Sequence, residues 1–107
     1  MLTLIPPAET AKKPQIDAAV EEVLKELSPA VQRIRYEIAQ DWSGEWALFF
    51  SVLLSDEVSD RKNRREIVPR VIDSMSDRVY QAELGLFPHF HFRSQSEQAK
   101  HPDPAWE

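Results

Sequence analysis

The segment Trp46–Leu54 constrains the fold more than any other part of the sequence. It reads Trp-Ala-Leu-Phe-Phe-Ser-Val-Leu-Leu, carries no charge and is apolar everywhere except at Ser51. A strand with one face in water alternates apolar and polar side chains, whereas a strand covered on both faces is apolar at successive positions. We therefore expect a central β-strand. Helices of this chain can cover one of its faces, and the other needs the amino-terminal arm, the tail, a second copy or a different protein.

Two amphipathic helices are predicted from the spacing of apolar residues. They recur every three or four positions in residues 15–27 and again in the region around Pro69, with charged residues between them. A proline inside a helix removes one backbone hydrogen bond. The second helix is therefore either bent and begins near Arg61, or short and begins near Glu66.

Two further strands are predicted from alternation. Residues 31–42 and 86–94 alternate apolar with polar side chains, which is typical of strands with unlike faces. Ser43 and Gly44 lie between the first of these segments and the central strand. Such a pair indicates a hairpin connection, so the first two strands should be antiparallel.

The order helix, strand, strand, helix, strand predicts an α+β fold. A crossover through the second helix makes the third strand parallel to the second. The result is a ferredoxin-like half with a three-stranded sheet in the order 1-2-3 and two helices on one face. We expect an extended arm over residues 1–14, a single α+β domain over 15–94 and a polar tail over 95–107.

Composition limits the classes of function. Hydrophobic residues make up 42% and charged residues 29% of the 107 residues, which indicates one globular domain. The absence of cysteine excludes disulfides and thiolate chemistry. No apolar run approaches the ~18 residues of a membrane helix, and the first residues lack the pattern of a signal peptide. We expect a soluble, cytoplasmic protein that does not bind membranes.

Charge argues against a general nucleic-acid binder, because the net charge is -5 and such affinity depends on neutralising phosphates. The sign is uneven along the chain, however. A basic run is either a solvated helical face or a surface for phosphate or an acidic partner. It consists of Arg61, Lys62, Arg64 and Arg65.

The helix-free face of the expected sheet is the leading candidate for function. Alternation places the odd-numbered residues of 86–94 on one side of the third strand, beside half of the central strand. A patch this apolar is rare on a free monomer. We therefore expect an interaction module that dimerises or binds a protein partner through this face. Its anchors would be Phe49, Leu53 and Phe87, with His89, His91 and Arg93 as neighbouring polar contacts.

A metal-binding or metal-sensing domain is the alternative. His89 and His91 lie two residues apart on a strand, so both imidazoles can reach one ion such as zinc. A third ligand would come from Glu37, from His101 or from a second subunit. In the leading hypothesis the protein needs no cofactor.

The sequence carries no recognisable catalytic pattern. Acidic residues near the strand ends lack a glycine-rich phosphate loop, because Gly44 and Gly85 are the only glycines. Ser43 lacks the strand-to-helix elbow that exposes a nucleophile. We expect turn and capping roles for these acids and a non-enzymatic protein. The acids are Asp41, Asp56, Glu57 and Asp60.

Three short segments resemble a group of small uncharacterised bacterial proteins. They read DWSGE at 41–45, FFSVLLSDE at 49–57 and FRSQSE at 92–97. Genes of that group often neighbour those of HEPN-domain proteins, which are helical and frequently act as RNA-cleaving toxins. The resemblance implies a binding partner, with a HEPN-domain protein as the candidate, and suggests an antitoxin-like role. The resemblance implies no catalytic residue in this chain.

Overall fold

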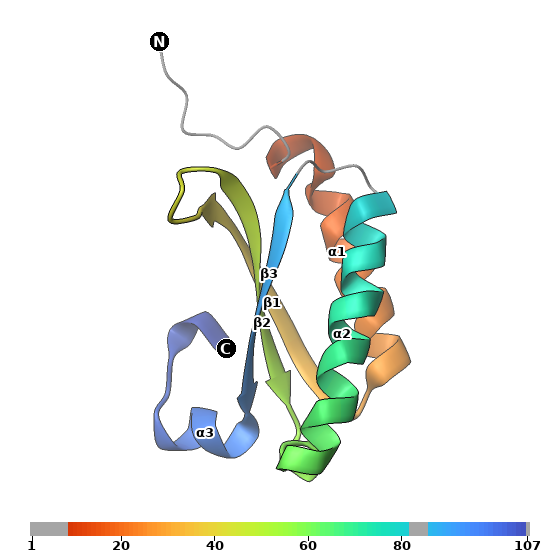
Figure 1. Cartoon of the computed structure of the whole chain (residues 1–107), viewed down its shortest axis with the longest axis vertical. Coiled ribbons are helices and arrows are strands. Elements are labelled where there is room, and N and C mark those ends of the chain that lie inside the picture. Colours follow the sequence, from red (N-terminus) through yellow and green to blue (C-terminus); the bar gives the residue numbers. More distant parts are fainter. Residues whose placement is uncertain (1–8, 82–85, 107) are drawn as a thin grey trace.

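The computed structural model describes residues 9–81 and 86–106 (Figure 1). The chain forms helices, strands and two short 3-10 turns. They are α1 (Glu9–Leu27), β1 (Val31–Gln40), β2 (Trp46–Leu54), η1 (Asp56–Val58), α2 (Arg61–Gln81), β3 (Phe87–Ser94), α3 (Gln95–Lys100) and η2 (Pro104–Trp106).

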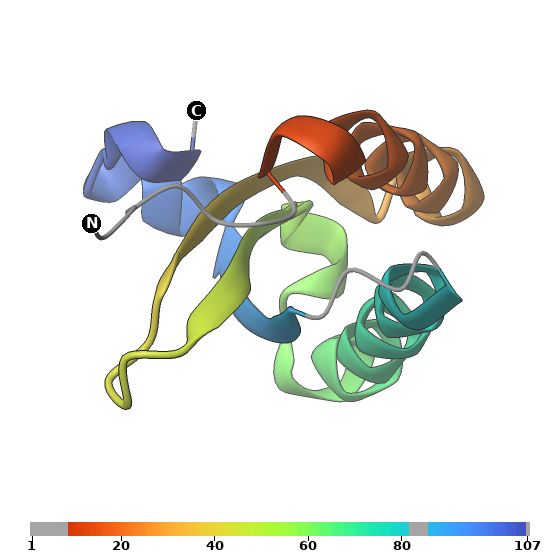
Figure 2. The same cartoon turned by 90° about the horizontal axis from the view of Figure 1, so that it is seen from above.

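The sheet has the predicted order β1-β2-β3. β1 pairs antiparallel with β2, and β2 pairs parallel with β3. Helices α1 and α2 lie side by side on the same face of this sheet (Figures 1 and 2). The predicted α+β fold and the central position of β2 are therefore confirmed.

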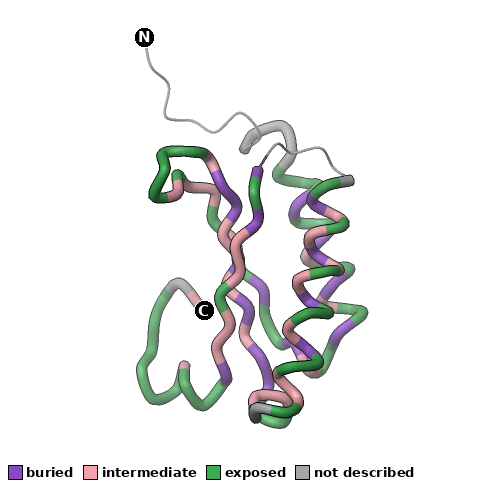
Figure 3. Tube along the Cα trace, in the orientation of Figure 1, coloured by how far each residue is buried: buried purple, intermediate pink, exposed green. Residues whose placement is uncertain are grey.

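The hydrophobic core fills the space between the two helices and the sheet. Alternate residues of β2 point into it and have no exposed surface: Leu48, Phe50, Val52 and Leu54. Figure 3 shows buried positions recurring along both long helices and along the strands. Burying one such side chain contributes about 1.5–3 kcal/mol, so this layer holds the helices on the sheet.

Both long helices contain a proline, and the first helix begins earlier than predicted. α1 begins at Glu9 and includes Pro14, so residues 9–14 are helical and not part of an extended arm. The rest of the predicted arm lies outside the described residues. α2 begins at Arg61 and includes Pro69, which agrees with the longer of the two predicted helices. Each proline removes a single backbone hydrogen bond, which a helix of about 20 residues tolerates when its other face is packed.

The predicted hairpin turn is present and is held by one carboxylate. Asp41 Oδ1 accepts hydrogen bonds from the Ser43 hydroxyl at 2.6 Å and from the N–H groups of Ser43 and Glu45 at 2.8 and 3.1 Å. Gly44 has φ 87°, in the left-handed region that favours glycine. The bond from the Ser43 hydroxyl is the main reason why the pKa of Asp41 lies below its ordinary value.

The carboxyl-terminal residues are ordered differently from the predicted polar tail. We call residues 95–106, which contain α3 and η2, the C-terminal segment. It lies on the opposite side of the sheet from α1 and α2, and η2 contacts β1 and β2 (Figures 1 and 2). The Ser94 side chain accepts from the N–H of Glu97, and the Glu97 side chain accepts from the N–H of Ser94. This capping box starts α3, so the predicted polar tail contains regular structure that the sequence pattern did not indicate.

None of the helices in residues 9–81 and 86–106 is long and apolar enough to cross a membrane.

Candidate functional site

The strand register brings the six sequence candidates onto the helix-free face. Phe49 is opposite His89, and Leu53 is opposite Arg93. Phe87 and His91 have the same parity along β3. The third strand of this face is β1, which contributes Glu37 opposite Phe49. The face is therefore formed by all three strands.

An aromatic cluster occupies the half of this face nearest the hairpin turn. The imidazole of His89 stacks on the Phe49 ring, with centroids 4.9 Å apart and planes 15° apart. The Trp42 and Phe87 rings also contact His89, at 5.5 and 5.1 Å between centroids. Trp42 and Phe87 remain 87% and 62% exposed. We call these four residues the aromatic patch.

The packing of His89 leaves one polar atom unsatisfied. Its Nε2 is buried and has no hydrogen-bond partner among the described residues. A buried polar atom without a partner costs about 1–3 kcal/mol and is uncommon in stable folds. His89 Nε2 is thus the polar atom that the packing of the aromatic patch leaves without a partner among the described residues.

Arg93 has a different role from the one predicted. Its guanidinium donates to Gln98 Oε1 and to the carbonyl oxygen of His101, both at 2.6 Å. It also lies 5.9 Å from the centre of the Trp106 ring. Arg93 therefore holds the C-terminal segment and is not available as a polar contact for a partner. Leu53, its cross-strand neighbour, is half-buried.

The two histidines do not form the core of a metal site in the described structure. His91 is exposed on the same face as His89. No group of three or more His, Asp or Glu side chains placed to hold an ion occurs in the described ranges. Glu37 lies on β1, two strands away from β3 and so about 10 Å from it. Neither Glu37 nor His101 forms such a group with the pair in the described ranges.

Turn and capping roles were predicted for four acidic residues near the strand ends. Three of the four have structural roles of this kind. Asp41 closes the hairpin turn. Asp56 accepts from the hydroxyl and the N–H of Ser96 at 2.7 and 2.9 Å, which joins η1 to α3. Asp60 accepts from the N–H of Asn63 at 2.9 Å and caps α2.

A tyrosine on the other face of β1 also has a structural role. The Tyr36 hydroxyl donates to Asp17 Oδ1 at 2.7 Å and accepts from Lys13 Nζ at 3.0 Å, which ties α1 to β1. Partial burial, followed by the bond to Asp17, raises the pKa of Tyr36 above its ordinary value of 10.0. A phenol shifted in this direction is a poor general base at neutral pH.

Trp42 is the member of the patch that the sequence did not predict. The predicted strand 31–42 included it, whereas β1 ends at Gln40 and Trp42 lies in the hairpin turn, so the alternation of that strand does not place it on this face. A large apolar side chain immediately before a Ser-Gly turn was the available signal, because such turns are normally polar.

Comparisons with known proteins add no assignment. No protein-family model matches the chain, and no curated protein or solved structure is significantly similar to it.

Proposed function

We propose that the chain is a non-enzymatic interaction module that self-associates through the aromatic patch. The observation that carries the proposal is the exposure of Trp42 and Phe87 around the packed ring of His89. Exposed aromatic residues clustered at one place are typical anchors of protein interfaces. A contact over this patch would remove their surfaces from water and contribute about 25 cal/mol per Å² of apolar area.

The charges around the patch favour a second copy as the occupant. Arg35 and Glu37 lie beside it on β1, and Asp41 lies next to Trp42. A two-fold interface places the same surface against itself, so its rim must carry both signs of charge to be complementary. A rim of one sign would repel its copy, and this rim is mixed.

The C-terminal segment limits the interface to one half of the sheet face. Arg93 and η2 hold that segment over the other half. The expected need for a cover on the second face of β2 is therefore met in part by the chain itself. Within residues 9–81 and 86–106, Trp42 and Phe87 of the aromatic patch are the part that stays exposed.

Light scattering over a wide range of concentration tests the proposal. We expect the mass of the wild-type protein to rise from monomer to dimer, and the Phe87→Asp variant to stay monomeric. The matched control is Tyr80→Asp, because Tyr80 is an exposed aromatic residue on α2, away from the sheet face. It should dimerise like the wild type.

Two results would contradict self-association through the aromatic patch. One is a dimer that persists in Phe87→Asp, which would place the interface elsewhere. The other is a wild-type protein that is monomeric at every concentration. A different protein would then be the occupant to test, and the sequence resemblance names a HEPN-domain protein.

A further inference from the structure

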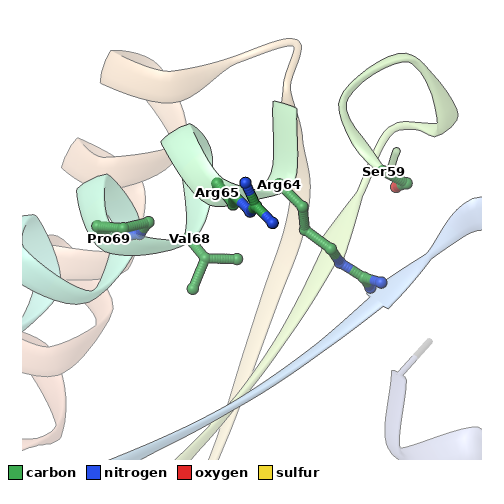
Figure 4. Close-up of a pocket in the computed structure, with 5 residues that line it drawn as sticks. All are labelled: Ser59, Arg64, Arg65, Val68 and Pro69. Carbon is green, nitrogen blue, oxygen red and sulfur yellow. The ribbon is translucent and has the colours of Figure 1, made fainter. Parts of the chain in front are cut away.

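A groove that is separate from the aromatic patch runs along the first half of α2. Its volume is about 630 Å³. It is lined by residues of α2 and by one residue that precedes the helix (Figure 4). These are Ser59, Arg64, Arg65, Val68 and Pro69. The groove lies outside the aromatic patch and plays no part in the function proposed above.

The groove is positively charged although the protein as a whole is acidic. Arg65 is exposed, and its side chain forms no ion pair or hydrogen bond with the described residues. Arg64 pairs with Glu97 at 3.3 Å. Asp56 and Asp60, the nearby acids on η1 and before α2, accept bonds from Ser96 and Asn63 instead. The Arg65 guanidinium is thus left with unused donors beside the groove.

Pro69 and Val68 add an apolar surface. Pro69 is exposed and Val68 is half-buried, and both line the groove. Proline has no N–H to donate to the carbonyl of residue 65, and its ring occupies the place of that donor. The groove therefore combines a guanidinium with apolar contacts.

We propose that this groove binds an acidic peptide segment of a partner protein. A carboxylate would pair with the Arg65 guanidinium, and an apolar side chain would lie on Val68 and Pro69. A nucleic-acid backbone has phosphates for the guanidinium but no apolar group to lie on Val68 and Pro69. The net charge of -5 also repels a long polyanion. The combination of a cationic donor and an apolar surface matches a peptide.

An array of short peptides tests this proposal with the full-length protein. Each peptide places Asp or Glu at one of several spacings from Leu, Ile or Phe, and its neutral counterpart carries Asn or Gln. We expect acidic peptides to bind and neutral counterparts to bind poorly. Fluorescence anisotropy of the best peptide should show a loss of about tenfold for Arg65→Glu, which is the size of one good charge-assisted contact.

The matched control is Arg70→Glu, which makes the same change of charge on an exposed position of the same helix that does not line the groove. It should bind the peptide like the wild type. Equal losses in both variants would indicate a nonspecific effect of charge and overturn the proposal. So would an array on which no acidic peptide exceeds its neutral counterpart. A single-stranded oligonucleotide that binds the wild type more tightly than any peptide, and Arg65→Glu less, would assign the groove to nucleic acid instead.

Discussion

The guanidinium of Arg93 donates to the backbone carbonyl oxygen of His101 at 2.6 Å, which ties the end of β3 to a residue eight positions further along the chain. The same group bonds Gln98 and lies over the Trp106 ring. One half-buried arginine thus connects the sheet with both parts of the C-terminal segment. It explains why a short polar stretch lies against the sheet face.

We expect Arg93→Ala to release the C-terminal segment. Loss of bonds from a charged donor should lower the free energy of unfolding by about 1–3 kcal/mol, and hydrogen exchange should accelerate in residues 95–106. The control is Arg33→Ala, which removes an exposed arginine side chain on the same sheet face that has no hydrogen bond with the described residues. Unchanged exchange in residues 95–106 of Arg93→Ala would show that other contacts hold the segment.

The core position of Phe50 predicts a large loss of stability on truncation. Its ring is fully buried and stacks on Phe90, with centroids 5.1 Å apart. Phe50→Ala should lower the free energy of unfolding by about 3–5 kcal/mol through lost burial and the cavity left behind. Phe87→Ala, on the helix-free face, should lower the free energy of unfolding far less. Urea denaturation of both variants makes the comparison, and equal losses would mean that β2 has its faces reversed.

Stability should fall in acid because four carboxylates have lowered pKa values. Bonds from the Ser96 hydroxyl and N–H hold the pKa of Asp56 below its ordinary 3.8, and the bond from the Ser94 N–H is the largest cause for Glu97, below its ordinary 4.5. Asp41 and Asp60 shift in the same direction. A lowered pKa in the folded state stabilises the fold above the ordinary value, and this contribution disappears as pH falls through the lowered one. Urea unfolding should therefore give constant stability near neutrality and a decline below about pH 4.5.

Asp56→Asn isolates one part of this pH dependence. The variant cannot titrate at that position, so its stability should decline less steeply in acid than that of the wild type. Asp73→Asn removes an exposed carboxylate of α2 that has no hydrogen bond with the described residues, and it should leave the slope unchanged. An identical slope in all three proteins would show that the Asp56–Ser96 bonds do not contribute.

The sequence predicts the sheet well because its signals are local. Continuous apolarity identifies β2 as central, and Asp41 and Gly44 specify the turn that sets the register of β1. The first turns of α1 have no apolar stripe and contain Pro14, so no periodicity shows that they are helical. Their structure follows from the packed helix that they extend.

The candidate site could be predicted only in part. Alternation places Phe49, Phe87 and His89 on one face, but the approach of Trp42 depends on the curvature of the hairpin. The role of Arg93 depends on the fold of the C-terminal segment, whose six-residue α3 is too short for a periodic pattern. Its capping box, Ser94 to Glu97, was the one local signal for it.

The missing backbone hydrogen bond in α2 gives a prediction that separates stability from binding. In Pro69→Ala the new N–H can donate to the Arg65 carbonyl, which completes the helix. The gain is offset in part by the greater freedom of the unfolded chain, so the free energy of unfolding should rise by about 1–2 kcal/mol. Binding of the best acidic peptide should weaken, because the proline ring that lines the groove is lost. Pro14→Ala makes the same change inside α1 and should raise stability in the same way while peptide affinity stays constant. Equal or tighter peptide binding by Pro69→Ala than by Pro14→Ala would show that the ring does not contribute to the groove.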